Sequence, residues 1–251
     1  MASSPGAGPA DEGTGLYLDR AHAGRVLASA LRGTVFRESP TGDSLPGSGH
    51  LPLVVGLSRG GVAVAAEVAR ALGLPFDVVP ARKLGIPGHE EVAFGAIASC
   101  DGERCADVDM PLVRRLLAAG FANASLERGR QREISELERQ EALFLAGRRQ
   151  GAAGRTVIVC DDGAATGDTA RAAIAAVRAA GARAVVLALP VAPPGVVEDL
   201  AEVADRVVCP HQPPAFLSVG GAYKGFPQCS DDEVRGLLEH RDAPLDRPAP
   251  G

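Results

Sequence analysis

Short apolar runs alternate with amphipathic stretches along most of the chain, and this alternation limits the possible folds more than any other feature. Residues 51–58 form an apolar run, residues 60–73 have helical spacing and end at a glycine, and residues 75–82 form a second apolar run. The same order recurs over residues 155–191. Strands that alternate with helices build a mostly parallel sheet flanked by helices, so the sequence predicts an α/β fold.

The remaining segments are compatible with one domain over residues 16–240. Residues 1–15 and 241–251 are rich in Gly, Pro and Ala and are expected to be disordered tails, and turn residues predict a loop over 39–50. Further helices and strands are expected at the following positions: an opening helix at 19–31, a strand at 92–98, a helical region at 108–149 with a break near Gly120, a helix at 194–203 and a strand at 205–210.

Composition excludes several classes of protein. The five cysteines form no CxxC pair, which favours a reduced protein without disulfides or structural zinc. There is no leader-like start and no run of about 20 apolar residues, so we expect a cytoplasmic protein that does not enter a membrane. With 26 basic and 31 acidic residues the net charge is −5, which gives no reason to expect nucleic-acid binding.

The segment TVIVCDDGAATGDT, residues 156–169, carries the most specific chemistry. An apolar strand ends in Asp161 and Asp162, and a loop of small residues then opens a helix. A helix N-terminus at the carboxyl end of a strand binds anions, while adjacent carboxylates suit hydroxyl groups or a divalent cation. A ligand with a phosphate, a diol and a metal fits these residues, although an Asp-Asp turn before a structural helix is the alternative.

This segment resembles the phosphoribosyl diphosphate (PRPP) signature of type I phosphoribosyltransferases, in which a strand leads into two acids, small residues and Thr-Gly-x-Thr. The resemblance implies that Asp161 and Asp162 are catalytic, hold the ribose hydroxyls and bind Mg²⁺. It implies that the PRPP 5′-phosphate is bound by the following loop residues: Ala164, Ala165, Thr166, Gly167, Asp168 and Thr169.

A second glycine-rich turn, GLSRGGV at residues 56–62, lies between a predicted strand and a predicted helix. Paired glycines let the backbone fold closely around an anion, and Arg59 adds a planar fork of donors. The turn resembles the diphosphate loop of the family, although by itself a plain helix start would explain it equally well. The resemblance assigns diphosphate binding to Ser58, Arg59, Gly60 and Gly61.

Residues 81–96, ARKLGIPGHEEVAFGA, supply two more basic side chains. Arg82 and Lys83 are expected to end a strand, and the Gly- and Pro-containing stretch after them is expected to be a mobile loop. The segment resembles the flexible loop of this family, which implies that Arg82 and Lys83 bind the diphosphate and that Lys83 and Arg59 assist its departure. The alternative is a pair of solvated basic residues at a strand end.

Aromatic residues gather near the C-terminus, within residues 209–234. Phe216, Tyr223 and Phe226 are candidates for stacking on a flat acceptor, with Phe216 and Tyr223 assigned to acceptor binding and core packing as the alternative.

The resemblance covers residues 16–240, and it is to a bacterial group of stand-alone phosphoribosyltransferases. It implies a mostly parallel sheet with a small hood from the chain ends, a homodimer, and Mg²⁺-dependent transfer of the 5-phosphoribosyl group from PRPP to a small nucleobase-like nitrogen acceptor, with release of diphosphate. Members that act on 6-oxopurines commonly carry Asp where this chain has Ala165, which disfavours hypoxanthine and guanine. Two alternatives stay open: a phosphatase or hydrolase acting on a sugar phosphate or nucleotide, and a non-catalytic regulator that binds PRPP or a nucleotide.

Overall fold

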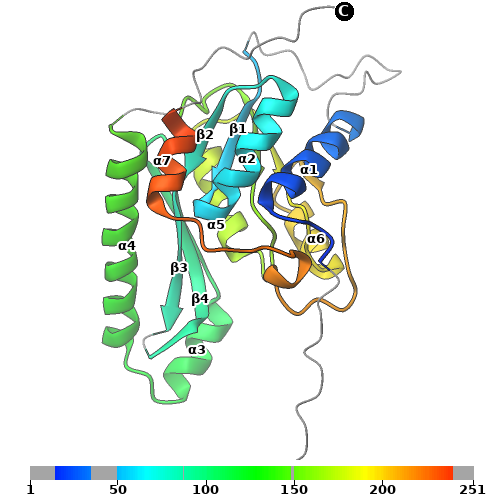
Figure 1. Ribbon diagram of the computed structural model, residues 1–251. Coiled ribbons are helices and arrows are strands. Elements are labelled where there is room, and N and C mark those ends of the chain that lie inside the picture. Colours follow the sequence, from blue (N-terminus) through cyan, green and yellow to red (C-terminus); the bar gives the residue numbers. More distant parts are fainter. Residues whose placement is uncertain (1–14, 35–49, 87, 148–149, 240–251) are drawn as a thin grey trace, which may run out of the picture.

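The computed structural model describes most of the 251-residue chain, namely residues 15–34, 50–86, 88–147 and 150–239. The tails expected over 1–15 and 241–251 and the loop expected over 39–50 lie, but for Gly15 and His50, outside the described residues. Figure 1 shows helices packed on both faces of a central sheet, with a second, smaller sheet beside it. The predicted α/β architecture is therefore confirmed.

A five-stranded parallel sheet forms the centre of the molecule. Its strands, in spatial order, are β2 (Phe76–Val79), β1 (Leu53–Leu57), β6 (Thr156–Cys160), β7 (Ala184–Ala188) and β8 (Arg206–Val208). All residues of β1, β2 and β6 are buried, as expected of strands whose two faces are both covered. This burial explains why these strands read as continuous apolar runs rather than as alternating ones.

Two hydrophobic cores cover the two faces of this sheet. On one face, Val54 and Ile158 pack against three helices, which are α1 (Arg20–Thr34), α2 (Ser58–Leu72) and α7 (Asp231–Glu239). On the other face, Val55 and Val159 pack against α5 (Asp168–Ala179) and α6 (Pro194–Ala201). Successive residues of a strand point to opposite faces, so each strand contributes to both cores.

The segment after β2 differs from the sequence-based expectation. The expected strand over 75–82 is interrupted at Pro80, and β3 (Ala81–Ile86) continues past Lys83 into an antiparallel pair with β4 (His89–Cys100). The mobile loop expected after Lys83 is thus largely a hairpin. The reason is burial, because Leu84 and Ile86 pack against Phe94 and α4.

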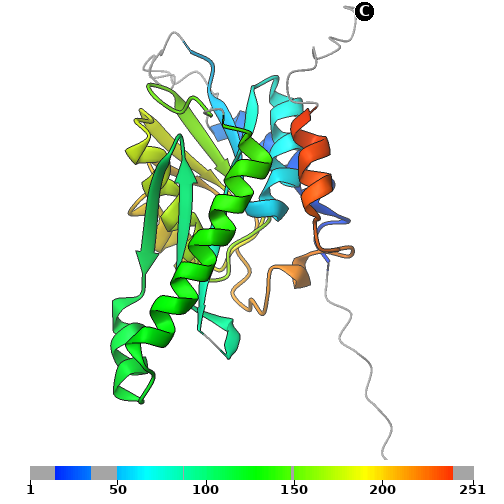
Figure 2. The same cartoon turned by 90° about the vertical axis from the view of Figure 1, so that its left-hand side faces the viewer.

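The smaller sheet has the order β3-β4-β5, where β5 is Glu103–Val108. Two helices follow it, α3 (Met110–Ala118) and α4 (Asn123–Leu145), with the break near Gly120 as predicted. Figure 2 shows α4 lying along this sheet, and Leu126 and Leu137 of α4 share a core with Ile97 of β4. The hairpin and α4 together form one wall of the cleft described below.

The chain connections create a switch point between β1 and β6. From β1 the chain passes through α2 to β2 on one side, and from β6 it passes through α5 to β7 on the other side. Gly56 and Cys160 are paired neighbours at the carboxyl ends of these strands. In open α/β sheets, the crevice outside the strand ends at such a switch point is where ligands bind.

The start of the described domain and the segment before α7 meet beside this crevice and form the hood, here defined as residues 15–19 and 216–229. Tyr17 forms a bridge with Tyr223, and the Lys224 amide donates to the Tyr17 carbonyl at 2.8 Å. The Tyr17 hydroxyl donates to the Pro190 carbonyl at 2.8 Å, which ties the hood to the segment after β7. Figure 1 shows the blue N-terminal segment beside the orange segment that precedes α7.

The five cysteines are free thiols in this structure. Over the described ranges, no helix combines the length and the apolar character that crossing a membrane requires.

Candidate active site

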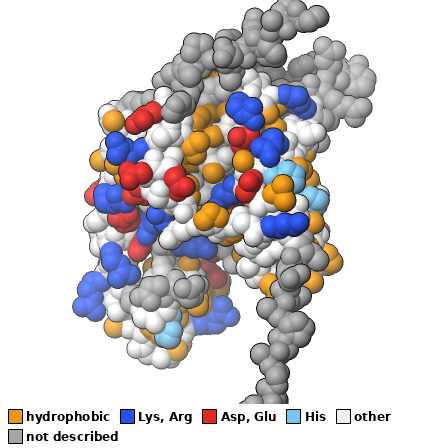
Figure 3. Space-filling view, viewed as in Figure 1, with side chains coloured by type: hydrophobic (Ala, Val, Ile, Leu, Met, Phe, Trp, Pro, Cys, Tyr) orange, Lys and Arg blue, Asp and Glu red, His pale blue; other side chains and the backbone are white. Residues whose placement is uncertain are grey.

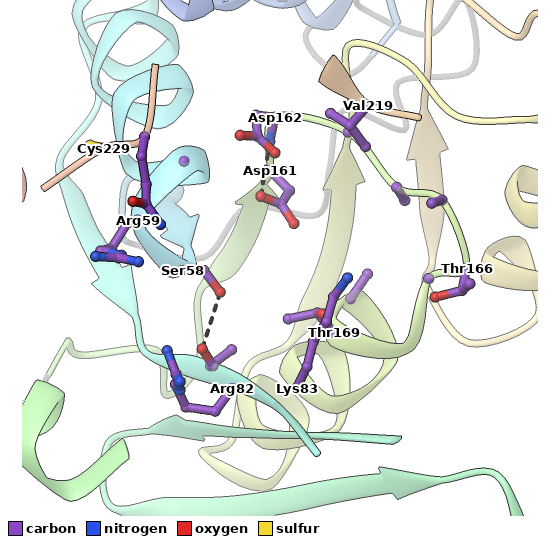
Figure 4. Close-up of a pocket in the computed structure, with 18 of the residues that line it drawn as sticks. Ser58, Arg59, Arg82, Lys83, Asp161, Asp162, Thr166, Thr169, Val219 and Cys229 are labelled. Carbon is purple, nitrogen blue, oxygen red and sulfur yellow. Dashed lines mark hydrogen bonds between the residues drawn. The ribbon is translucent and has the colours of Figure 1, made fainter. Parts of the chain in front are cut away.

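A cleft of about 820 Å³ opens at the switch point. It is walled by the turn between β1 and α2, by β3 and α4, by the loop between β6 and α5, and by the hood. Figure 4 shows the acid pair at the end of β6, Ser58 and Arg59 on one side of it, Thr166 and Thr169 on the other, and Arg82 and Lys83 entering from β3. The predicted site residues that line this cleft are Ser58, Arg59, Gly60, Arg82, Lys83, Asp161, Asp162, Ala164, Ala165, Thr166, Gly167 and Thr169.

The acid pair stands directly after β6, where the strand end leaves the sheet. Asp161 Oδ1 accepts a hydrogen bond from the Asp162 amide at 2.9 Å. Burial raises the pKa of the Asp161 carboxyl well above its usual range, and the charge of Asp162 raises it further. Burial also raises the pKa of Asp162, and a hydrogen bond from Arg20 offsets part of that rise. Two carboxylates held close together with little water favour a bound cation or hydroxyl donors.

Arg20, at the start of α1, is a site residue that the sequence analysis missed. Its Nε donates to Asp162 Oδ2 at 2.8 Å, and its NH1 donates to the Pro227 carbonyl at 2.6 Å. Its guanidinium carbon lies 3.9 Å from the ring centre of Phe226. Because Arg20 and Asp162 are 142 positions apart, no local sequence pattern could have paired them.

The loop between β6 and α5 is shaped by two glycines. Gly167 has a φ of 83° and caps α5, a conformation that glycine adopts without strain. At Gly163 (φ 153°), a Cβ would lie 2.8 Å from a side-chain carbon of Val219 in the hood. The Thr166 hydroxyl donates to Asp168 at 2.8 Å, so Asp168 braces the loop, but Asp168 does not itself line the cleft. The loop presents the free amides of a helix N-terminus to the cleft.

The turn between β1 and α2 lies against the acid pair. A Cβ on Gly60 would be 2.1 Å from Asp162 Oδ2, and one on Gly61 would be 2.6 Å from the Cys160 carbonyl. Gly60 lines the cleft, whereas Gly61 is buried beneath it. Ser58 has a φ of 54°, a left-handed conformation that is uncommon for serine. Its hydroxyl donates to the Ala81 carbonyl at 3.2 Å, which links the turn to β3.

The three predicted cations differ in their partners. Lys83 is exposed, and its charge lowers the pKa of both acids of the pair. Arg82 pairs with Glu133 of α4 at 2.8 Å. Arg59 lies 3.6 Å from Asp231 at the start of α7.

Tyr223 and Phe216, two of the predicted aromatic residues, lie in different surroundings within the hood. Tyr223 is 6% exposed, does not line the cleft, and donates from its hydroxyl to the Asp162 carbonyl at 2.5 Å. Burial raises the pKa of this hydroxyl, which keeps it protonated as a donor. Phe216 packs beside the core formed by Tyr17 and Tyr223 and does not line the cleft either.

Several lining residues were absent from the sequence-based site. They come from α1, α4 and the hood, all of which are remote in sequence from the two glycine-rich loops: Arg20, Arg132, Glu133, Gln140, Val219, Gln228 and Cys229. Phe226, one of the predicted aromatic residues, also lines the cleft. Three aromatic rings of the hood are neighbours in a row, since the centre of the Tyr223 ring lies 5.4 Å from that of Tyr17 and 4.8 Å from that of Phe226. Tyr223 therefore supports Phe226, which lines the cleft.

The acid pair also fits a divalent cation. Within the described part of the chain, no three His, Cys, Asp or Glu side chains are grouped so as to hold a metal ion. Mg²⁺, however, is commonly bound by one or two carboxylates together with substrate phosphates and water. Arg20 and Lys83 offset only part of the cost of ionising Asp161 and Asp162, since the pKa of each carboxyl stays raised, so the pair suits a cation shared with a phosphorylated ligand.

Fold and cleft together define a class of protein: an α/β protein with two glycine-containing strand-to-helix loops on either side of an acid pair at a sheet switch point. Comparison with known proteins agrees with this class. The family described as "Phosphoribosyl transferase domain" matches residues 43–219. The chain belongs to this phosphoribosyltransferase family.

Individual relatives support the assignment. Proteins of two Mycobacterium tuberculosis strains, CDC 1551 / Oshkosh and ATCC 25618 / H37Rv, each named "putative phosphoribosyl transferase", are 44% identical over 230 residues. These matches include 90% of this chain and 48% of the relatives, so the chain spans about half of their length. The crystal structure of TT1426 from Thermus thermophilus is similar with a TM-score of 0.64 and 39% identity, over 88% of this chain and 97% of that one.

Proposed function

We propose that this protein transfers the 5-phosphoribosyl group of PRPP to a nitrogen atom of a small, nucleobase-like acceptor and releases diphosphate, with Mg²⁺ as cofactor. The observation that carries the proposal is the order of groups across the cleft. Asp161 and Asp162 lie between the loop at Thr166 and Thr169 and the turn at Ser58 and Arg59. PRPP has the same order of groups: a phosphate, a ribose diol and a diphosphate.

In this proposal the loop of residues 164–169 binds the 5′-phosphate through helix N-terminal amides and threonine hydroxyls. Asp161 and Asp162 accept hydrogen bonds from the ribose hydroxyls and hold Mg²⁺. When bound there, Mg²⁺ would neutralise charge on the diphosphate. The sugar is thereby fixed with its C1′ carbon turned toward the acceptor.

The reaction breaks the bond from C1′ to diphosphate oxygen and forms a bond from C1′ to the acceptor nitrogen, with inversion at C1′. The electron pair of the broken bond leaves with diphosphate. Arg59, Arg82 and Lys83 line the cleft and would stabilise this growing negative charge. Among the described residues no histidine lines the cleft, so we propose a nitrogen nucleophile that needs little activation and loses its proton to solvent.

The acceptor would lie against the hood side of the cleft, where Phe226 and Val219 offer apolar surface. The Tyr223 ring packs against Phe226, and its hydroxyl donates a hydrogen bond to the backbone carbonyl of Asp162. Tyr223 would therefore support the hood side of the cleft from below the surface. Ala165 leaves the loop without the carboxylate expected of a 6-oxopurine site. We therefore propose a flat acceptor other than hypoxanthine or guanine.

Calorimetric titration with PRPP and Mg²⁺ tests the ligand. Wild-type protein is expected to bind PRPP, and the double variant Asp161→Asn/Asp162→Asn is expected to lose binding while remaining folded. Asp232→Asn, an exposed acid on α7, is the matched control and should bind normally. The proposal fails if wild-type protein does not bind PRPP at millimolar concentration, or if the double variant binds it equally well.

A further inference from the structure

Glu133 is an acidic side chain in the wall of a cleft that the proposed function fills with a strongly anionic ligand. It lies on α4, remote in sequence from both glycine-rich loops, and its side chain is 13% exposed. Its Oε2 accepts from Arg82 at two positions, Nε at 3.0 Å and NH2 at 2.8 Å. Its Oε1 lies 3.5 Å from the Nε of Arg132, which also lines the cleft.

This arrangement has two physical consequences for Arg82. The two hydrogen bonds fix the plane of the guanidinium, and a fixed fork of donors loses less entropy when it binds a phosphate group. The carboxylate also cancels the charge of Arg82, and this weakens the attraction of Arg82 for an anion. Glu133 therefore both orients the Arg82 guanidinium and limits its affinity for an anion.

The other proposed diphosphate arginine also faces a carboxylate, but as an ion pair without a hydrogen bond. Arg59 lies 3.6 Å from Asp231 Oδ1, an oxygen that is buried without a hydrogen-bond partner. The second oxygen of Asp231 pairs with Arg139 of α4 at 2.7 Å. Figure 3 shows acidic and basic side chains interspersed on this face of the molecule. Both arginines thus face a carboxylate that belongs to a helix outside the two loops.

We propose that Glu133 is a positioning residue that orients Arg82 and, through its negative charge, sets how tightly the cleft holds diphosphate. The proposal rests on the proposed function, because it takes diphosphate as a ligand of Arg82. A carboxylate at this place keeps the cleft from retaining its product. The ligand class is a magnesium diphosphate, either free or as part of PRPP.

Two variants of Glu133 separate its effect on the orientation of Arg82 from the effect of its negative charge. Glu133→Gln keeps an oxygen that accepts from Arg82 but removes the charge, so inorganic diphosphate with Mg²⁺ is expected to bind about fivefold more tightly, equal to about 1 kcal/mol at 25 °C. Glu133→Ala removes charge and acceptor together, so its affinity is expected to fall below that of Glu133→Gln. Glu127→Gln is the control, because Glu127 is an exposed acid of the same helix that pairs with Arg130 outside the cleft.

The route through Arg82 is tested in an Arg82→Gln background, where Glu133→Gln should bring a clearly smaller gain in affinity, because only its effect on Arg132 and on the ligand itself remains. Calorimetry with inorganic diphosphate measures each affinity, and circular dichroism confirms that each variant is folded. The inference is overturned if Glu133→Gln binds diphosphate as wild-type protein does or more weakly, or if the gain is undiminished without Arg82. If wild-type protein binds neither diphosphate nor PRPP, the proposed function fails instead.

Discussion

Replacing Arg20 with methionine removes the guanidinium that pairs with Asp162 and keeps most of the apolar stem. The two side chains are 12% and 15% exposed, so the pair is largely shielded from water. The change also removes the hydrogen bond to the Pro227 carbonyl and the contact with Phe226. Asp162 is then left as a partly buried carboxylate without its cationic partner.

The size of the effect follows from these contacts. Removing one partner of a buried ion pair costs about 3–5 kcal/mol, and the lower end applies here because Asp162 keeps some contact with water. We therefore expect Arg20→Met to lower the free energy of unfolding by about 3 kcal/mol at neutral pH. For a domain of this size that loss corresponds to a fall in Tm of about 6–12 °C.

The effect should depend on pH with a definite sign. Burial already raises the pKa of Asp162, and removing Arg20 raises it further. A carboxyl group with a raised pKa in the folded state destabilises the fold when ionised, and this penalty disappears as pH falls through the folded pKa. The difference in stability between wild-type protein and Arg20→Met should therefore shrink as the solution is acidified.

Urea unfolding followed by circular dichroism, repeated across pH, measures both predictions. The matched control is Arg25→Met, because Arg25 lies on the same helix, is 50% exposed and stands 3.8 Å from Glu67. This control should change stability by no more than about 0.5 kcal/mol. Adding Asp162→Asn to Arg20→Met should restore part of the loss. The reasoning is refuted if Arg20→Met costs no more than the control, or if its cost does not change with pH.

Three further predictions concern the same region. Asp161→Asn should raise Tm at about pH 8, since the raised pKa of this carboxyl makes its ionised form destabilising, and thermal scans should show the gain fading toward about pH 4. Gly60→Ala should lower stability by about 1–3 kcal/mol and weaken PRPP binding, because the new Cβ meets Asp162, whereas Gly236→Ala on α7 has open space and should preserve binding in the same titration. Tyr223→Phe should lower stability by about 1 kcal/mol in urea unfolding through loss of the hydrogen bond to the Asp162 carbonyl, and an unchanged midpoint would argue against that bond.

Much of the site was predictable because its chemistry is local. Asp161 and Asp162 follow a buried strand and precede a helix N-terminus, so a few neighbouring residues determine where they lie. The turn at Gly60 and Gly61 is local in the same way. The parallel sheet then brings the two segments together at the ends of β1 and β6.

The features of the fold and the site that the sequence did not predict depend on contacts between distant segments. The strand expected at 92–98 lies within β4, but the stretch between Lys83 and that strand was mistaken for a loop, because its Gly and Pro residues concealed the buried side chains of Leu84 and Ile86. Arg20 and Glu133 carry no motif, and each reaches the cleft through the packing of a helix. Such contacts follow from the assembled fold rather than from neighbouring residues.

Phosphorus NMR of the protein incubated with PRPP and Mg²⁺, with and without a panel of nucleobases and amines, tests the proposed transfer most directly. We predict diphosphate and a new phosphoribosyl product only when an acceptor is present, and neither with Asp161→Asn/Asp162→Asn. Release of orthophosphate, or release of diphosphate with ribose 5-phosphate in the absence of any acceptor, would contradict the proposal and identify a hydrolase. PRPP that binds but stays intact with every acceptor would contradict it as well, in favour of a binding protein.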